Sequence, residues 1–99
     1  MYGQLTTVEF GTAAQREEAL KLLSAAVQRI RVMRGFEAAY YLVVDELRII
    51  IVTIFETEDN LDAIQGELAA ARGQAHEIGA EFTRTEKYRV MAFAAGGAP

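Results

Sequence analysis

The chain has 99 residues, of which 52% are hydrophobic and 24% charged, and this composition predicts a single ordered globular domain. Its net charge of −4 and the scattered positions of its ten basic residues argue against nucleic acid as a partner. The absence of cysteine excludes disulfide bonds and thiolate metal sites, and the acidic residues show no metal-ligand spacing, so no metal is expected. No apolar run is long enough to cross a bilayer and no signal-peptide pattern is present, so we expect a cytoplasmic protein without a membrane partner.

The first third of the chain predicts a strand followed by an amphipathic helix. Residues 2–10 alternate loosely between polar and apolar types and end at Gly11. Thr12 and Gln15 then match a capping box, in which each side chain satisfies a backbone amide of the first helical turn. Apolar residues recur at helical spacing as far as about Arg31, namely Leu20, Leu23, Val27 and Ile30.

The middle of the chain predicts a hairpin of two apolar strands. Gly35 is expected to end the first helix or to form a turn, because glycine adopts positive φ without strain. Residues 36–44 and 47–55 are rich in aromatic and β-branched types and are joined by the polar pair at 45–46. Arg48 is a charge in an otherwise apolar strand, so it is expected either in solvent at the hairpin end or paired with a glutamate.

The last third predicts a second helix and a last strand. Acidic and polar residues at 56–60 suit a helix N-terminus. Apolar residues then recur every three or four positions over 61–78, which predicts one continuous helix closed by Gly79. Residues 82–93 predict a charged strand at a sheet edge, and the Gly/Ala-rich tail over 94–99 is expected to be flexible.

The order β-α-β-β-α-β predicts an α+β ferredoxin-like sandwich over residues 1–93, with two helices on one face of a four-stranded antiparallel sheet. The first and third strands are expected at its centre. Both faces of the second strand are apolar, and alternation predicts one face with Phe36, Ala38, Tyr40, Leu42 and Val44 and another with Ala39, Tyr41 and Val43.

Two helices can cover only one of the two apolar sheet faces. An uncovered apolar face is rare in a monomer, so we expect a homodimer that packs the two bare faces together. The alternative is that the C-terminal tail or a different protein covers the face, but six residues of Gly, Ala and Pro are too few for that.

The first strand is polar for the centre of a sheet. Gln4 and Thr6 share one face with Val8 and Phe10, so a covered strand would bury them. Buried polar groups need partners, which makes both residues candidates for the lining of a pocket. The alternative for Thr6 is that threonine occurs in the strand by β-propensity alone.

Three residues are candidates for catalysis. His76 is the only histidine and lies beside the apolar stripe of the second helix; histidine is a common general base, but this position is also typical of a surface residue. Tyr40 and Tyr41 are adjacent in a strand, so one should point toward the helices and the other toward the dimer partner. Each is either a packed core residue or a pocket residue that orients an aromatic ligand.

Three segments carry a family resemblance: Arg-Gly-Phe at 34–36, the Asp-Glu hairpin at 45–46, and the segment 49–61, in which an apolar strand ends in Phe55 before an acidic and a small polar residue. With them the chain resembles the antibiotic biosynthesis monooxygenase superfamily over nearly its whole length, from Gln4 to Phe93. The members of this superfamily are dimeric α+β barrels.

The resemblance implies a pocket between sheet and helices, in which cofactor-free enzymes of this superfamily oxidise aromatic or polyketide-like substrates, so we expect no cofactor. It also implies a pocket position for Phe55, which stands where members usually have a tryptophan. Other members degrade haem with an Asn, a Trp and a His, but this chain has no Trp and offers Gln4 in place of the Asn. The alternative function is a non-catalytic dimer for ligand binding or interaction, as in ferredoxin-like effector-binding modules.

Overall fold

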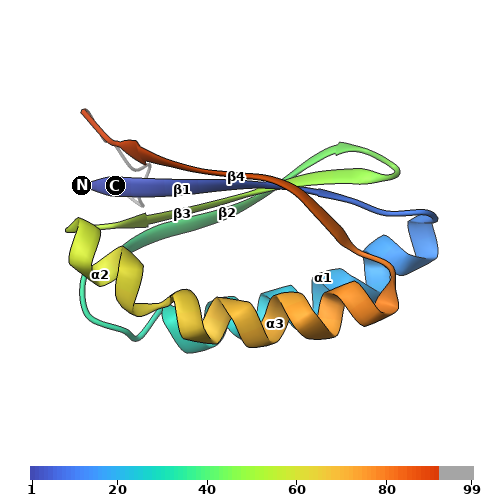
Figure 1. Ribbon diagram of the computed structural model, residues 1–99, viewed down its shortest axis with the longest axis horizontal. Helices are drawn as coiled ribbons and strands as arrows, with labels where there is room; N and C mark the ends of the chain where they lie inside the picture. The colour runs from blue at the N-terminus through green and yellow to red at the C-terminus, as the bar shows by residue number, and fades with distance from the viewer. Residues whose placement is uncertain (92–99) are drawn as a thin grey trace, which may run out of the picture.

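An antiparallel four-stranded sheet carries all the helices on one face (Figure 1). The computed structural model describes residues 1–91, whose elements run in the order β1 (Tyr2–Glu9), α1 (Ala13–Ile30), β2 (Phe36–Asp45), β3 (Arg48–Phe55), α2 (Glu58–Ala63), α3 (Gln65–Ile78) and β4 (Glu81–Arg89). The strand order is β2-β3-β1-β4, which places β1 and β3 at the centre. This confirms the predicted α+β ferredoxin-like fold.

Helix α1 starts and ends as its sequence predicts. The Thr12 hydroxyl accepts a hydrogen bond from the Gln15 amide at 3.1 Å, and the Gln15 side chain accepts one from the Thr12 amide at 3.1 Å. After the helix the chain reverses at Gly35, whose φ is 83°. A Cβ there would also collide with the side chain of Asn60, so two constraints require glycine at this turn.

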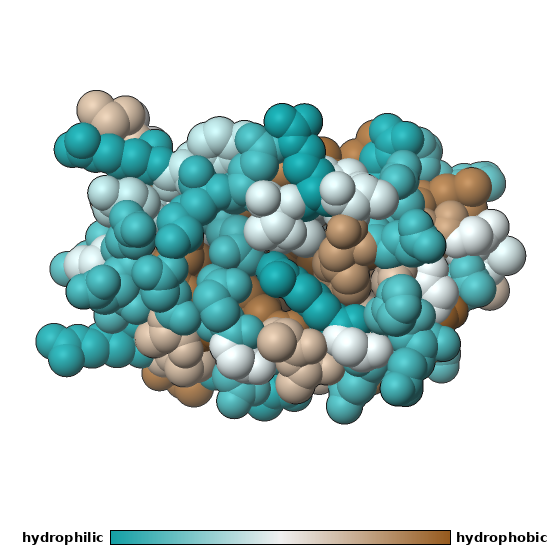
Figure 2. Space-filling model, viewed as in Figure 1, coloured by the Kyte–Doolittle hydropathy of each residue, from teal (hydrophilic) through white to brown (hydrophobic). Residues whose placement is uncertain are grey.

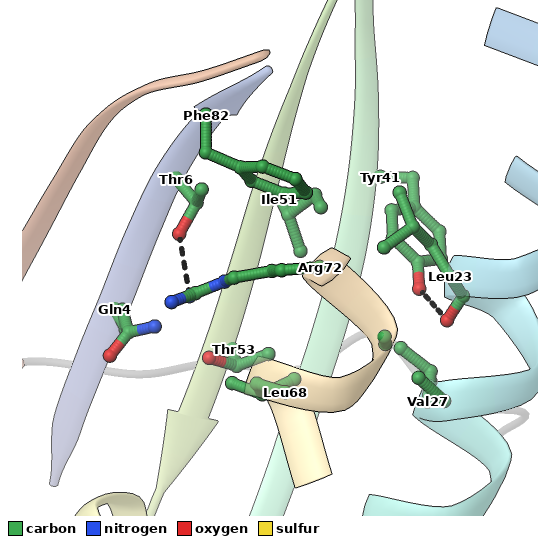
Figure 3. Close-up of a pocket in the computed structure, with 12 residues that line it drawn as sticks. Gln4, Thr6, Leu23, Val27, Tyr41, Ile51, Thr53, Leu68, Arg72 and Phe82 are labelled. Carbon is green, nitrogen blue, oxygen red and sulfur yellow. Dashed lines mark hydrogen bonds between the residues drawn. The ribbon is translucent and has the colours of Figure 1, made fainter. Parts of the chain in front are cut away.

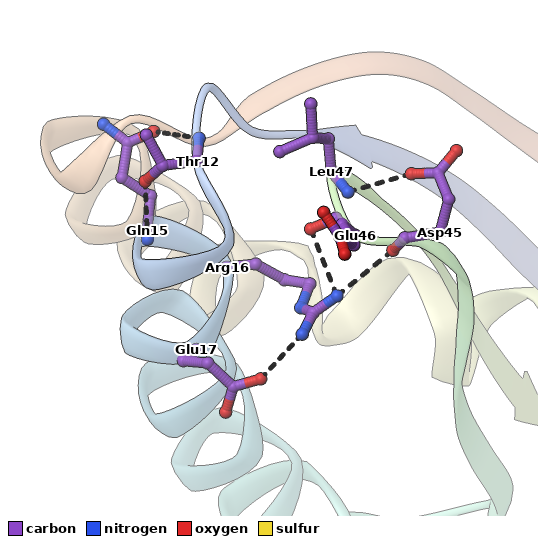
Figure 4. A network of polar contacts seen from close by, with 7 residues as sticks. All are labelled: Thr12, Gln15, Arg16, Glu17, Asp45, Glu46 and Leu47. Carbon is purple, nitrogen blue, oxygen red and sulfur yellow. Dashed lines mark hydrogen bonds and ion pairs between the residues drawn. The ribbon is translucent and has the colours of Figure 1, made fainter.

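The β2–β3 turn is tied to the first turns of α1 (Figure 4). The Nη1 atom of Arg16 donates to the backbone carbonyls of Asp45 and Glu46 at 3.2 and 3.1 Å, and its Nη2 atom pairs with Glu17 at 2.9 Å. The Asp45 carboxylate accepts from the Leu47 amide at 2.9 Å and so closes the turn itself. At the hairpin end Arg48 is exposed and pairs with a glutamate, Glu9, which unites the two placements expected for it.

The second helix differs from the expectation of one continuous helix over 61–78. It is broken at Ile64, where α2 ends and α3 begins. Ile64 is fully buried in one core cluster with Phe55 and Leu61. Because the apolar spacing of three and four residues continues across the break, periodicity alone cannot reveal it. Gly79, at φ 120°, ends α3 as predicted.

The two faces of β2 also differ from the expected alternation. Irregular pairing between Phe36 and Ala38 shifts the register, so Phe36 packs on the helix side against Phe55, edge to face with ring centroids 5.6 Å apart. The expectation that Phe36 shares a face with Tyr40 is therefore wrong, since a bulge reverses the parity of the side chains. Tyr41 faces α1 and Tyr40 the opposite side, as adjacent strand positions predict.

Within residues 1–91, the core between sheet and helices consists of two separate apolar clusters. One contains Val8 of β1, Phe10 directly after that strand, and Ile49 of β3. The other contains Phe55 with the helical residues Ile30, Leu61 and Ile64. Between them, the helix-facing positions of the central strands are polar: Gln4, Thr6 and Thr53. The apolar core is thus interrupted at its middle, and this interruption positions the candidate site.

Figure 2 shows a mostly polar side over β4 and α3, with apolar atoms reaching the surface in a strip between sheet and helix. Within residues 1–91, no helix is long and apolar enough to cross a membrane. The last strand, predicted over 82–93, ends earlier, at Arg89. The predicted flexible tail at 94–99 lies outside the described residues.

Candidate functional site

A small cavity lies where the two core clusters separate, between the central strands and the helices α1 and α3 (Figure 3). Its volume is about 20 Å³, which is room for about one water molecule. Its walls are formed by Gln4, Thr6, Leu23, Ala26, Val27, Tyr41, Ile51, Thr53, Leu68, Ala71, Arg72 and Phe82.

The buried polar residues of the chain gather at this cavity. Within residues 1–91, the buried side chains of polar type are Gln4, Thr6 and Thr53, with exposed fractions of 5%, 3% and 3%. All three line the cavity. Burying a polar group without full hydrogen bonding costs about 1–3 kcal/mol, so a core shaped only for stability would carry apolar side chains at these positions.

A chain of hydrogen bonds fixes the orientation of the Gln4 amide. Because α2 ends at Ala63, the Leu61 carbonyl is available to the Gln65 side chain, whose Nε2 atom donates to it at 3.0 Å. The same Nε2 atom donates to the Gln4 Oε1 atom at 3.0 Å. With its oxygen engaged in this way, Gln4 turns its amide nitrogen toward the cavity (Figure 3).

Arg72 on α3 brings a positive charge into the site. Its guanidinium lies 5.7 Å from the centroid of the Phe82 ring, and its Nη2 atom is 3.5 Å from the Thr6 hydroxyl oxygen. Within residues 1–91, no carboxylate forms an ion pair with Arg72; Arg16, Arg29, Arg48 and Arg84, by contrast, each pair with a glutamate. Burial lowers the pKa of Arg72, because the charged form loses hydration there.

Tyr41 forms part of the wall next to α1. Its hydroxyl donates to the backbone carbonyl of Leu23 at 2.5 Å, which holds the ring in place. Burial raises the pKa of Tyr41, because the phenolate would lose hydration. The side chain is therefore a neutral, oriented phenol, and at neutral pH it does not act as a base.

The structure brings together some of the residues that the sequence singled out and separates others. Gln4, Thr6 and Tyr41 line the cavity. Tyr40 lies on the opposite face of the sheet and is 44% exposed, and Phe55 is fully buried in the second core cluster without lining the cavity. His76 is exposed in the last turn of α3, with its Nδ1 atom 3.1 Å from the Ala80 carbonyl oxygen.

Sequence reasoning missed Arg72, Gln65 and Thr53. A signal for Arg72 was present: it follows Leu68 by four residues and so falls on the apolar stripe, and no acidic residue stands three or four positions from it. The role of Gln65 depends on the break at Ile64 and has no sequence signal. Within residues 1–91, no group of three or more His, Asp or Glu side chains is placed to hold a metal ion.

The chemistry available at this cavity is recognition through hydrogen-bond donors and one cation. The donors are the Gln4 amide nitrogen, the Thr6 and Thr53 hydroxyls and the Arg72 guanidinium, set among apolar and aromatic walls. Among the described lining residues there is no carboxylate, imidazole or amine, and so no side chain suited to general-base catalysis at neutral pH.

No family model and no curated protein matches the sequence, but solved structures match the fold. A "putative antibiotic biosynthesis monooxygenase" from Deinococcus radiodurans has a TM-score of 0.82 at 13% identity, covering 98% of this chain and 100% of its own. A protein of the same description from Nitrosomonas europaea has a TM-score of 0.78 at 12% identity, over 93% and 100% of the two chains. A "dimeric ferredoxin-like protein" from an uncultured marine organism has a TM-score of 0.66 at 14% identity, over 96% and 92%.

At these identities the likeness establishes the fold alone. The chain therefore has the ferredoxin-like fold of proteins described as antibiotic biosynthesis monooxygenases, in agreement with the resemblance of its sequence.

Proposed function

We propose that the protein is a homodimer whose protomers each bind a small aromatic molecule between the sheet and the helices. The observation that carries this proposal is the convergence of the buried polar residues Gln4, Thr6 and Thr53, with the cation of Arg72, on one cavity. The cavity lies inside an otherwise apolar core, and ligand sites combine apolar walls with a few oriented polar groups in this manner.

The aromatic class of the ligand is supported by the walls of the cavity. The Phe82 and Tyr41 rings stand on two sides of it, and aliphatic side chains from α1 and α3 close the rest. In the present conformation the cavity holds only about one water, so a larger ligand requires a side chain to move. Arg72 is the side chain best placed to move, because it is long and is held by two weak contacts, one of 3.5 Å to Thr6 and one of 5.7 Å to the Phe82 ring.

The homodimer is supported by the sheet face that no helix covers in residues 1–91. Tyr40 and Leu42 of β2 are 44% and 49% exposed there, beside Val52 and Ile50 of β3, with which they pair. Packing two such faces about a twofold axis buries apolar surface on both copies, and a stable interface needs about 800 Å² per partner. One of the matching solved structures is described as dimeric.

A catalytic role, cofactor-free oxidation of an aromatic or polyketide-like substrate, is the second candidate. It is supported by the description of the matching structures as monooxygenases. The cavity offers no general base among its described lining residues, so a substrate oxidised there would have to arrive already ionised. Ligand binding is therefore the first candidate function and catalysis the second. Oxygen consumption in the presence of a dihydroxynaphthalene would be evidence for catalysis.

Binding can be tested with two naphthalene probes, 1-naphthoate and 1-naphthamide, by calorimetry and thermal shift. We expect at least one of them to bind the wild-type protein and to raise its Tm. Ala26→Leu fills the cavity and should abolish binding, whereas Ala25→Leu, the same change on the exposed side of α1, should preserve it. Absence of binding to the wild type, or equal binding by both variants, would contradict the proposal.

A further inference from the structure

We propose that the ligand of this cavity is an organic anion, an aromatic carboxylate or phenolate, and that Arg72 is its counter-ion. This inference rests on the proposed function and adds the charge of the ligand to it. It begins from the state of Arg72, which is half-buried and without an acidic partner in residues 1–91. A partly desolvated cation without a counter-charge is unfavourable, so the site gains most from a ligand that supplies the negative charge.

The polar groups around Arg72 also favour a negatively charged ligand. Gln65 holds the oxygen of Gln4 away from the cavity, so that Gln4 offers its amide nitrogen. Figure 3 shows this nitrogen directed toward the Arg72 guanidinium, with the Thr6 hydroxyl above the same point. Two groups that can only donate thus face one another. An oxyanion placed between them accepts from both, whereas a neutral donor or a metal cation meets repulsion.

The existing contacts of Arg72 are weak enough for a ligand to replace them. Its 3.5 Å contact with Thr6 is at the limit of a hydrogen bond, and its position over Phe82 is a cation–π contact at 5.7 Å. An aromatic anion can take over both: its ring occupies the space next to Phe82, and its oxygens replace Thr6 as acceptors. The lowered pKa of Arg72 agrees with this, since an anion would restore the stability of the charged form.

The apolar walls decide between an organic anion and a small inorganic one. Leu23, Ile51 and Leu68 border the same cavity, and they give inorganic phosphate no hydrogen bonds. A flat aromatic body buries these side chains while its acidic group reaches Arg72. The site therefore combines one charged end with one apolar end, which matches an aromatic acid.

The experiment compares 1-naphthoate with its neutral isostere 1-naphthamide by calorimetry, at low and high salt. We expect the wild type to bind the anion about tenfold more tightly or better, as a charge-assisted hydrogen bond in a desolvated site does, with a smaller difference at high salt. Arg72→Met keeps the length of the side chain and removes the charge, so it should bring the two affinities together. Arg29→Met removes an exposed arginine from α1 and should leave the ratio unchanged.

Each outcome has one meaning. Tighter binding of the anion that is lost in Arg72→Met and kept in Arg29→Met supports the inference. Equal binding of both probes by the wild type, or an unchanged ratio in Arg72→Met, overturns the inference and leaves the proposed function standing. Binding of neither probe overturns the proposed function and the inference with it. If Arg72→Met fails to fold, the Nε–Hε NMR signal of Arg72 in the wild type must shift with 1-naphthoate and not with 1-naphthamide.

Discussion

Arg72 on α3 reaches across the middle of the core to Thr6 on β1, 66 positions away in the chain, with 3.5 Å between its Nη2 atom and the threonine hydroxyl. Among the described residues that line the cavity Arg72 has the only charged side chain, and this contact joins it to the centre of the sheet, between the two apolar clusters. The two apolar clusters thus stabilise the fold at its two ends. The polar residues between them lower its stability and can serve ligand recognition.

Thr53→Val should stabilise the protein. Thr53 is 3% exposed and lines the cavity, and valine replaces its hydroxyl with a methyl group of similar shape. We expect the free energy of unfolding, measured in urea, to rise by about 1 kcal/mol. Thr85→Val is the matched control on β4, where the side chain is exposed, and should change stability little. A loss of about 1 kcal/mol or more in Thr53→Val would show that the hydroxyl forms a stabilising hydrogen bond in the free protein and is not kept for a ligand.

The same substitution should have different effects on stability at two arginines, Arg16 on α1 and Arg72 on α3. Arg16→Met removes a guanidinium that bonds the carbonyls of Asp45 and Glu46, so we expect a loss of about 1–3 kcal/mol in urea unfolding. Arg72→Met removes a half-buried charge with no acidic partner in residues 1–91, so stability should stay unchanged or increase. Equal destabilisation by both changes would mean that Arg72 is a structural residue.

Gln65→Glu should turn the side-chain oxygen of Gln4, instead of its amide nitrogen, toward the cavity. A carboxylate cannot donate to the Gln4 oxygen, so Gln4 must turn its amide nitrogen toward it and its oxygen toward Arg72. We expect the affinity for 1-naphthoate to fall about tenfold while the affinity for 1-naphthamide is kept. Gln74→Glu makes the same change of charge at an exposed site on α3. An equal loss in both variants would assign the effect to overall charge and not to the orientation of Gln4.

Tyr41 predicts a specific loss of stability at high pH. Its pKa is raised in the folded state by burial, so above the ordinary tyrosine pKa of about 10 the unfolded chain releases a proton that the folded chain retains. Fewer protons bound by the unfolded state mean that stability falls as the pH rises above that value. Urea unfolding at pH 9 and pH 11 should show a steeper loss in the wild type than in Tyr41→Phe. Tyr40→Phe, on the exposed face, should behave as the wild type.

Leu42→Glu should convert the dimer to a monomer. Leu42 is 49% exposed on the bare sheet face, and a charge buried against a second copy would be strongly unfavourable. Size-exclusion chromatography with light scattering at micromolar concentration should give about twice the mass of the 99-residue chain for the wild type and a single mass for the variant. Val32→Glu places the same charge at a side chain that is 80% exposed away from the sheet and should stay dimeric. A monomeric wild type would refute the dimer.

Most of the fold follows from local sequence patterns. The capping box at Thr12 and Gln15 and the glycines at 35 and 79 each have a local physical cause, and all of them appear in the structure. The alternation of apolar residues in β2 holds at Tyr40 and Tyr41 and fails at Phe36. Two features of the structure were not predicted. The break at Ile64 leaves the apolar spacing intact, and the irregular pairing at Phe36 depends on the partner strand, so neither has a signal in its own segment.

The candidate site could be predicted only in part. Gln4 and Thr6 were detectable because polar residues at the centre of a sheet conflict with burial. Arg72 and Gln65 depend on how α3 docks, and their partners lie more than 60 positions away. A single sequence does not show which residues become neighbours across such separations, so Arg72 was missed.

A crystal structure of the wild-type protein with 1-naphthoate tests the central claim most directly. We predict that the naphthalene ring lies between the sheet and the helices beside Phe82, with its carboxylate within hydrogen-bond distance of Arg72 and of the Gln4 amide nitrogen. A carboxylate bound elsewhere, or a ring seated on the outer face of the sheet with the cavity unchanged, would contradict the account.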